Sequence, residues 1–113
     1  MVQLSGEKWE GSLHFNETSK ARGRVNSYSW YFQSKNNSWL VEIAEDQDVE
    51  PNELPLVGYG CGGWLYECSN EVNLPDVEVD FIKFIKIKLP FVFQLFNQGK
   101  LTYLPAVSCP CSD

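Results

Sequence analysis

The sequence predicts a small all-β domain, an antiparallel β-sandwich or partly open β-barrel of about six or seven strands, or an α+β variant with one short helix. A length of 113 residues is usual for one domain, so we treat residues 1–113 as a single globular β domain. A hydrophobic fraction of 43%, with 14% aromatic residues, is typical of a chain that folds around a core. Short runs rich in aromatic and β-branched residues alternate with turn residues, and no stretch shows convincing helical periodicity.

The first predicted strands lie in the aromatic part of the chain. A short strand fits residues 12–15, and residues 28–32 and 39–43 predict a hairpin because a polar Ser-Lys-Asn-Asn segment separates them. Residues 64–68 fit a further strand. The preceding residues 58–63 match G-x-G-x-x-G formally, but a strand-like run follows instead of a helix, so we interpret them as a turn or bulge and not as a dinucleotide site.

The most regular pattern lies at residues 77–89. Apolar residues occupy six of its seven odd positions, and charged residues occupy four of its six even positions. This period of two predicts a long, half-buried strand that Pro90 interrupts. Residues 91–96 and 101–104 then predict a second hairpin, because the short polar segment between them contains a glycine.

Charge is segregated along the chain. Residues 36–82 contain eleven acidic residues and no Lys or Arg, whereas the nine Lys and Arg residues all lie outside this window, and the formal net charge is −6. Residues 45–56 predict a long acidic surface loop with one helical turn after Pro51, and residues 105–113 predict an irregular C-terminal tail. The candidate partner-binding residues are the five acids of the loop: Glu45, Asp46, Asp48, Glu50 and Glu53.

Four cysteines form the candidate metal site. They fall into two pairs, which is the right number for a closed tetrahedral zinc site: Cys61 with Cys68, and Cys109 with Cys111. The six residues between the first two exceed the usual spacing of zinc ligands, so free thiols are the alternative, and a disulfide is the next in an oxidising compartment. We expect no obligatory cofactor.

Catalytic signatures are weak in this sequence. His14 is the only histidine, so Cys61 with His14 is the one nucleophile–base pair to consider, and no serine lies in a G-x-S-x-G elbow. The acidic residues of the loop do not match a calcium-binding EF-hand, because Pro51 stands where that loop needs glycine. We therefore predict that the protein is not an enzyme.

Aromatic residues offer a second kind of binding surface. The candidates for a stacking platform are Trp30, Tyr31, Trp39, Trp64 and Tyr66. Aromatic residues that alternate along a strand generally belong to the core, and Tyr28, Trp30 and Phe32 share one face. Tyr31 lies on the opposite face, which makes it the better surface candidate.

The function predicted from these features is binding. A one-signed acidic surface attracts basic partners, so we expect a non-catalytic protein that presents its acidic loop to a basic protein, as an inhibitor, an immunity-like protein or a mimic of nucleic acid. The alternative is a metal- or small-ligand-binding β module that uses the four cysteines or surface aromatics.

The same composition sets expectations about partners and compartment. An acidic chain is unsuited to binding nucleic acid or an anionic membrane directly, because both need clustered cations. The N-terminal residues lack the features of a signal peptide and no long apolar run is present, so we expect a cytoplasmic protein. If the predicted strand at 77–89 is an exposed edge, it invites homodimerisation.

Overall fold

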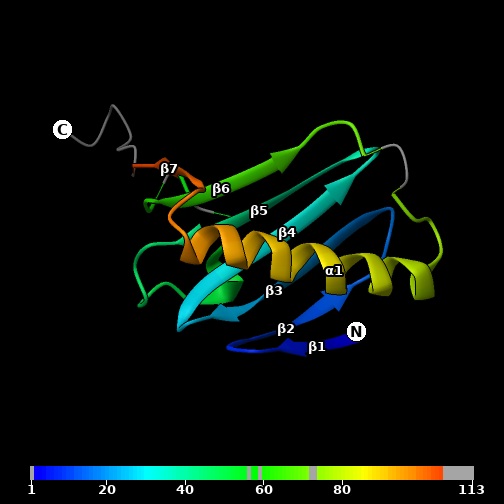
Figure 1. The fold of residues 1–113 in the computed structure, drawn as a ribbon, viewed down its shortest axis with the longest axis horizontal. Coiled ribbons are helices and arrows are strands. Elements are labelled where there is room, and N and C mark those ends of the chain that lie inside the picture. The colour runs from blue at the N-terminus through cyan, green and yellow to red at the C-terminus, as the bar shows by residue number, and fades with distance from the viewer. Residues whose placement is uncertain (1, 56, 59, 72–73, 106–113) are drawn as a thin grey trace.

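The computed structural model describes residues 2–55, 57, 58, 60–71 and 74–105. They form an open antiparallel sheet of seven strands in sequence order, with one long helix packed across one face (Figure 1). The predicted fold class is confirmed in its α+β form, because one helix packs on an antiparallel sheet of seven strands. The sheet is open, and it does not close into a barrel. The elements are β1 (Val2–Gly6), β2 (Trp9–His14), β3 (Thr18–Val25), β4 (Tyr28–Lys35), β5 (Ser38–Ala44), η1 (Pro51–Glu53), β6 (Gly63–Cys68), α1 (Glu78–Asn97) and β7 (Thr102–Leu104).

Tight turns join the first five strands. Asn26 and Ser27 connect β3 to β4 and both have positive φ, as a two-residue hairpin turn with the twist of its strands requires. Asn36 also has positive φ, a conformation that asparagine tolerates better than most residues, and it opens the turn between β4 and β5. The hairpin predicted from residues 28–32 and 39–43 is therefore confirmed.

The strand predicted at residues 77–89 is wrong, because this segment belongs to the 20-residue helix α1. Val79 and Ile87 lie on the outer face of the helix, 59% and 68% exposed, and these outward apolar residues produced the misleading alternation. The buried side chains recur at helical spacing and form one stripe against the sheet: Phe81, Ile85, Leu89, Val92 and Phe93.

The hairpin predicted after Pro90 is also wrong. Residues 91–96 continue α1 past the proline, and only Thr102–Leu104 forms a strand, which pairs with β6. Gly99 has φ +69° and ends the helix: its N–H donates to the Phe96 carbonyl, and the Lys100 N–H donates to the Leu95 carbonyl. This pair of bonds is a Schellman motif, so the glycine is a helix cap and not a hairpin turn.

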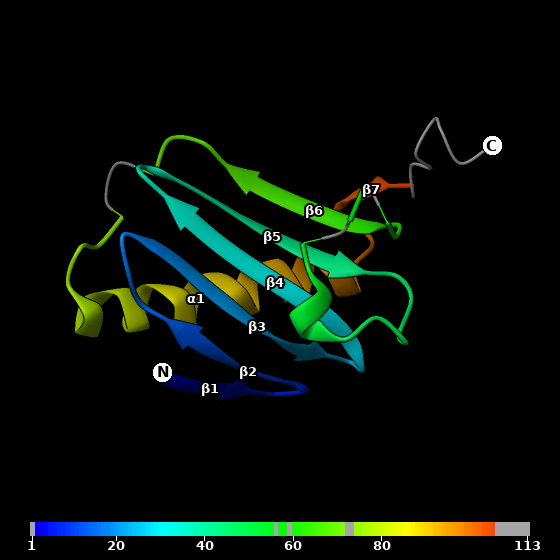
Figure 2. The same cartoon turned by 180° about the vertical axis from the view of Figure 1, so that it is seen from behind.

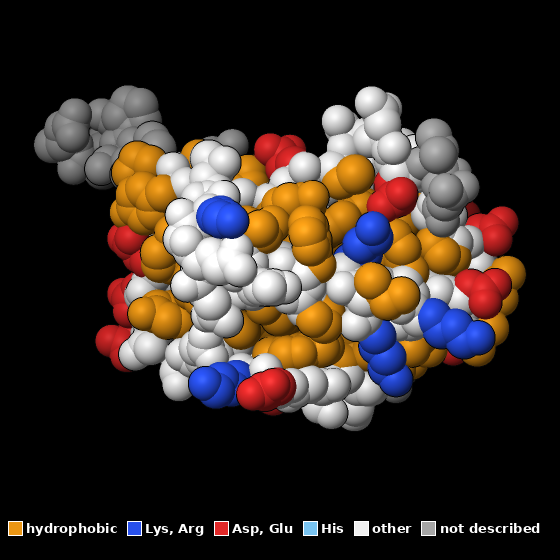
Figure 3. Space-filling model, in the orientation of Figure 1, with side chains coloured by type: hydrophobic (Ala, Val, Ile, Leu, Met, Phe, Trp, Pro, Cys, Tyr) orange, Lys and Arg blue, Asp and Glu red, His pale blue; other side chains and the backbone are white. Residues whose placement is uncertain are grey.

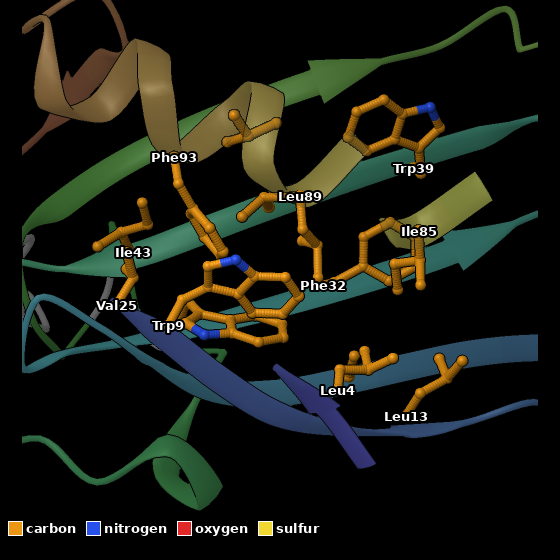
Figure 4. Packing of buried hydrophobic residues seen from close by; sticks show 14 of the residues in the cluster. Leu4, Trp9, Leu13, Val25, Phe32, Trp39, Ile43, Ile85, Leu89 and Phe93 are labelled. Atoms are coloured by element: carbon orange, nitrogen blue, oxygen red, sulfur yellow. The ribbon is translucent and has the colours of Figure 1, made fainter. Parts of the chain in front are cut away.

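The main core lies between α1 and the sheet. Indole and phenyl rings from the strands meet the apolar stripe of the helix, and Phe93 packs against both Trp9 and Trp30 at centroid distances of 5.4 and 5.5 Å (Figure 4). Gly11 and Gly23 are paired across β2 and β3, and a Cβ on Gly11 would lie 2.5 Å from the Trp30 ring. The absence of a side chain at Gly11 therefore lets this ring lie close to the sheet.

A second, smaller cluster lies on the other face of the sheet. Its buried residues come from the central strands and from the chain that follows β5: Tyr31, Ala44, Leu54, Val57 and Cys61. The segment between β5 and β6, which contains η1, covers this part of the face, as seen from behind the helix (Figure 2). β1 and β7 form the two edges of the sheet, so a homodimer through an edge strand would use these and not residues 77–89.

Candidate functional site

The candidate site is the acidic loop predicted at residues 45–56, of which the structure describes 45–55; it follows β5 on the face of the sheet opposite α1 (Figure 2). All five predicted acidic side chains are exposed in it: Glu45, Asp46, Asp48, Glu50 and Glu53. β5 ends in buried Ile43 and Ala44, so the chain leaves the core as the acidic run begins. The structure thus brings the sequence-predicted residues together on one surface.

Hydrogen bonds within the loop hold it in one shape. The Asp46 Oδ1 accepts from the backbone N–H of Asp48 at 2.9 Å, and the Glu53 Oε2 accepts from the backbone N–H of Glu50 at 2.6 Å. The second bond belongs to a capping box at η1, where Pro51 occupies the start of the helical turn. Two of the five carboxylates therefore shape the loop while they remain exposed.

Two arginines on β3 tie the loop to the sheet. Arg24 lies 3.0 Å from the Glu50 carboxylate and also donates to the Gln47 carbonyl at 3.3 Å. Arg22 donates to the Leu54 carbonyl at 3.2 Å, and its guanidinium lies 4.7 Å from the centre of the Tyr31 ring. Neither anchor was predicted from the sequence, although their alternate positions on one strand place them on the same face.

The loop keeps most of its negative charge. Among the residues that the structure describes, Arg24–Glu50 is the only ion pair in which the loop takes part. Glu45 accepts a hydrogen bond from the Tyr103 hydroxyl, which raises the pKa of Tyr103 but brings no positive charge. Four of the five carboxylates therefore have no cationic partner in the described part of the chain.

Beneath the loop, burial and nearby negative charge both raise the pKa of one side chain, the Cys61 thiol. Burial chiefly raises the pKa of the Cys61 thiol, and the carboxylates of Glu42, Asp46, Glu45 and Glu53 raise it further. These groups come from β5, the loop and η1, which follow one another in the chain, so the acidic residues of 42–53 act together on one thiol. The thiol is consequently held in its neutral form.

The predicted stacking surface is not formed by Tyr31. Tyr31 lies on the face opposite Trp30, as its position implies, but it is only 1% exposed because the segment after β5 covers it. Its hydroxyl donates to Gln33 at 2.8 Å, and burial is the main cause that raises its pKa. Of the other candidates, Trp30 and Trp39 are buried in the main core, and Trp64 and Tyr66 are half-buried against it.

The cysteines and the histidine do not converge among the described residues. Cys61 lies in the cluster under the loop and Cys68 packs against the core on the helix side, while Cys109 and Cys111 lie outside the described residues. No group of three metal-ligating side chains occurs in the part of the chain that the structure describes. A zinc site formed by all four cysteines stays a prediction.

The pair of Cys61 and His14 is not assembled. His14 lies at the end of β2, in the row of the sheet that runs through Lys20, Gln33 and Leu40. Cys61 lies beside the other end of β5, which is four residues, or about 13 Å, farther along the strands. A thiol and an imidazole so far apart cannot exchange a proton directly.

Comparison with known proteins gives no functional assignment. No family model, no curated protein and no solved structure matches this chain. Neither helix of the described residues combines the length and the apolar character that crossing a lipid bilayer requires.

Proposed function

We propose that this is a non-catalytic binding protein whose acidic loop presents carboxylates to a basic protein partner. One observation supports it above all: the loop is fixed by its own hydrogen bonds and by two arginines, yet four of its carboxylates have no cationic partner among the described residues. A preorganised array of charges binds with less loss of conformational freedom than a flexible one. Inhibition of a basic enzyme and mimicry of nucleic acid both require such an array.

The sign of the charge within the loop supports the same proposal. The acidic loop contains five carboxylates and no Lys or Arg. The helix face of the molecule, by contrast, carries both basic and acidic side chains (Figure 3). A local array of one sign attracts a basic partner toward the loop as it approaches.

The chemistry beneath the loop favours binding over catalysis. The Cys61 thiol is buried, and its raised pKa disfavours the thiolate that nucleophilic attack needs. Tyr31 is likewise buried with a raised pKa. Cys61 and Tyr31 are therefore poorly suited to act as a nucleophile or a base, and both contribute to the packing under the loop.

The test compares proteins captured from the cells that produce this chain. The loop variant Asp46→Asn/Asp48→Asn/Glu53→Gln removes three charges but keeps oxygen acceptors for the bonds that shape the loop. The control variant Glu7→Gln/Glu67→Gln/Glu78→Gln removes the same charge from exposed residues outside the loop and away from its arginine anchors. Each variant is used as bait beside the wild type, and captured proteins are quantified by mass spectrometry.

We expect the wild type and the control variant to capture the same basic protein, and the loop variant to retain about tenfold less of it. Three exposed ion pairs at about 0.5 kcal/mol each correspond to that factor. Equal capture by the loop and control variants would refute the proposal. So would the absence of any basic protein from the wild-type capture.

A further inference from the structure

A groove of about 850 Å³ lies at the end of the sheet remote from the acidic loop. The turns after β2 and β4, the residues before α1 and the first turns of α1 meet at this end (Figure 1). Its apolar floor includes Phe15 and Phe81, whose rings meet edge to face at a centroid distance of 5.4 Å. This volume lies in the range of sites that bind small molecules.

Two buried serines open onto this groove. Ser19 and Ser34 are paired across β3 and β4 and are 1% and 3% exposed. The Ser19 hydroxyl accepts from the Asn16 N–H at 3.1 Å and donates to the Asn16 carbonyl at 3.0 Å. Ser34 also lines the groove. A hydroxyl at the wall of a groove can both donate to and accept from a group that enters it.

The rim defines the chemistry of what can enter. It carries only amides and carboxylates as its polar side chains: Asn16, Asn36, Asn37, Glu17 and Asp76. No Lys, Arg or His is among the described residues that line the groove, so nothing there would neutralise an anion. Carboxylates accept hydrogen bonds only, whereas amides and hydroxyls both donate and accept. The complementary molecule therefore offers many hydroxyl donors, carries no negative charge and has an apolar face for the half-buried Phe15 ring.

We propose that this groove binds a neutral saccharide. The hydroxyls of the sugar donate to the rim carboxylates and amides, one hydroxyl pairs with Ser34, and the C–H face of the ring lies on Phe15. The site is separate from the acidic loop and does not depend on it. It adds a small-ligand function to the proposed protein-binding surface.

Ligand-observed NMR tests this with a defined panel. The neutral probes are D-glucose, N-acetyl-D-glucosamine, maltose and cellobiose, and the contrasting probes are glucose 6-phosphate and calcium chloride. Ser34→Ala removes the hydroxyl that pairs with the sugar. Asp76→Asn is the second site variant, and Ser5→Ala, an exposed position on β1, is the matched control.

We expect at least one neutral sugar to bind the wild type, Ser5→Ala and the loop variant equally, and to bind Ser34→Ala and Asp76→Asn about fivefold more weakly. Three results would overturn the proposal: no neutral sugar binds at millimolar concentration, the sugar binds both site variants as well as the wild type, or only glucose 6-phosphate or calcium binds. None of these results bears on the capture experiment, so the two proposals succeed or fail separately.

Discussion

At the scale of single residues, Cys61 best reports the environment under the acidic loop. It is 8% exposed, and burial raises its pKa above the ordinary value of 9.0 before the four nearby carboxylates add to the effect. The folded protein therefore holds the thiol proton more tightly than the unfolded chain does. A rise in pH above 9.0 first ionises Cys61 in the unfolded chain, which favours unfolding.

This linkage predicts an alkaline loss of stability. The contribution of Cys61 is fully present below its unfolded pKa and is lost as pH rises toward the folded pKa. Urea unfolding measured at a series of alkaline pH values should show a decline in the free energy of unfolding that is smaller in Cys61→Ala. Cys68→Ala, on the opposite face of the sheet, serves as control and should keep the wild-type slope. If Cys61→Ala lost stability with pH as steeply as the wild type, the Cys61 thiol of the wild type would not be shielded from solvent.

At the scale of elements, the sequence predicted those helices and strands whose position depends on neighbouring residues alone. The β4–β5 hairpin follows from two aromatic runs around a polar turn, and η1 follows from Pro51 in the acidic segment. α1 could not be predicted in the same way, because Val79 and Ile87 add apolar residues to its outer face and obscure the buried stripe. Which face of this segment is buried depends on the sheet, which is formed by residues remote in sequence.

The pairing of Gly11 with Gly23 across β2 and β3 is another feature that only long-range packing reveals. A Cβ on Gly23 would lie 1.9 Å from the Glu10 carbonyl oxygen and 2.5 Å from the Gly11 Cα. Both atoms belong to the backbone of β2, so the strands themselves would have to shift. Nothing in the local sequence shows that the two glycines are directly opposite each other.

Gly23→Ala should therefore destabilise the protein strongly. Overpacking against backbone of this kind costs about 3 kcal/mol, which urea unfolding followed by tryptophan fluorescence would measure. Ser5→Ala on the exposed strand β1 should stay within about 0.5 kcal/mol of the wild type. A Gly23→Ala protein that unfolds at the wild-type urea concentration would mean that β2 and β3 are not in this register.

At the scale of the whole molecule, the open sheet is covered differently on its two faces. α1 crosses one face, and the segment between β5 and β6 covers only part of the other (Figures 1 and 2). The acidic loop follows the end of β5, and the groove is lined by the turns after β2 and β4, so the two lie at opposite ends of the sheet. The sequence predicted the acidic loop because its charges are contiguous. It could not predict Arg22 and Arg24 as anchors or the groove, because these depend on contacts between strands and turns far apart in the chain.

The association rate of the captured basic protein, measured as a function of ionic strength, tests the central claim most directly. If the acidic loop steers the partner, the wild-type rate constant falls about tenfold or more from low to physiological salt. The loop variant then associates more slowly at low salt and with a shallower salt dependence, while the control variant follows the wild type. Identical rates and salt dependence for the loop and control variants would contradict the account, because net charge alone would then explain the binding.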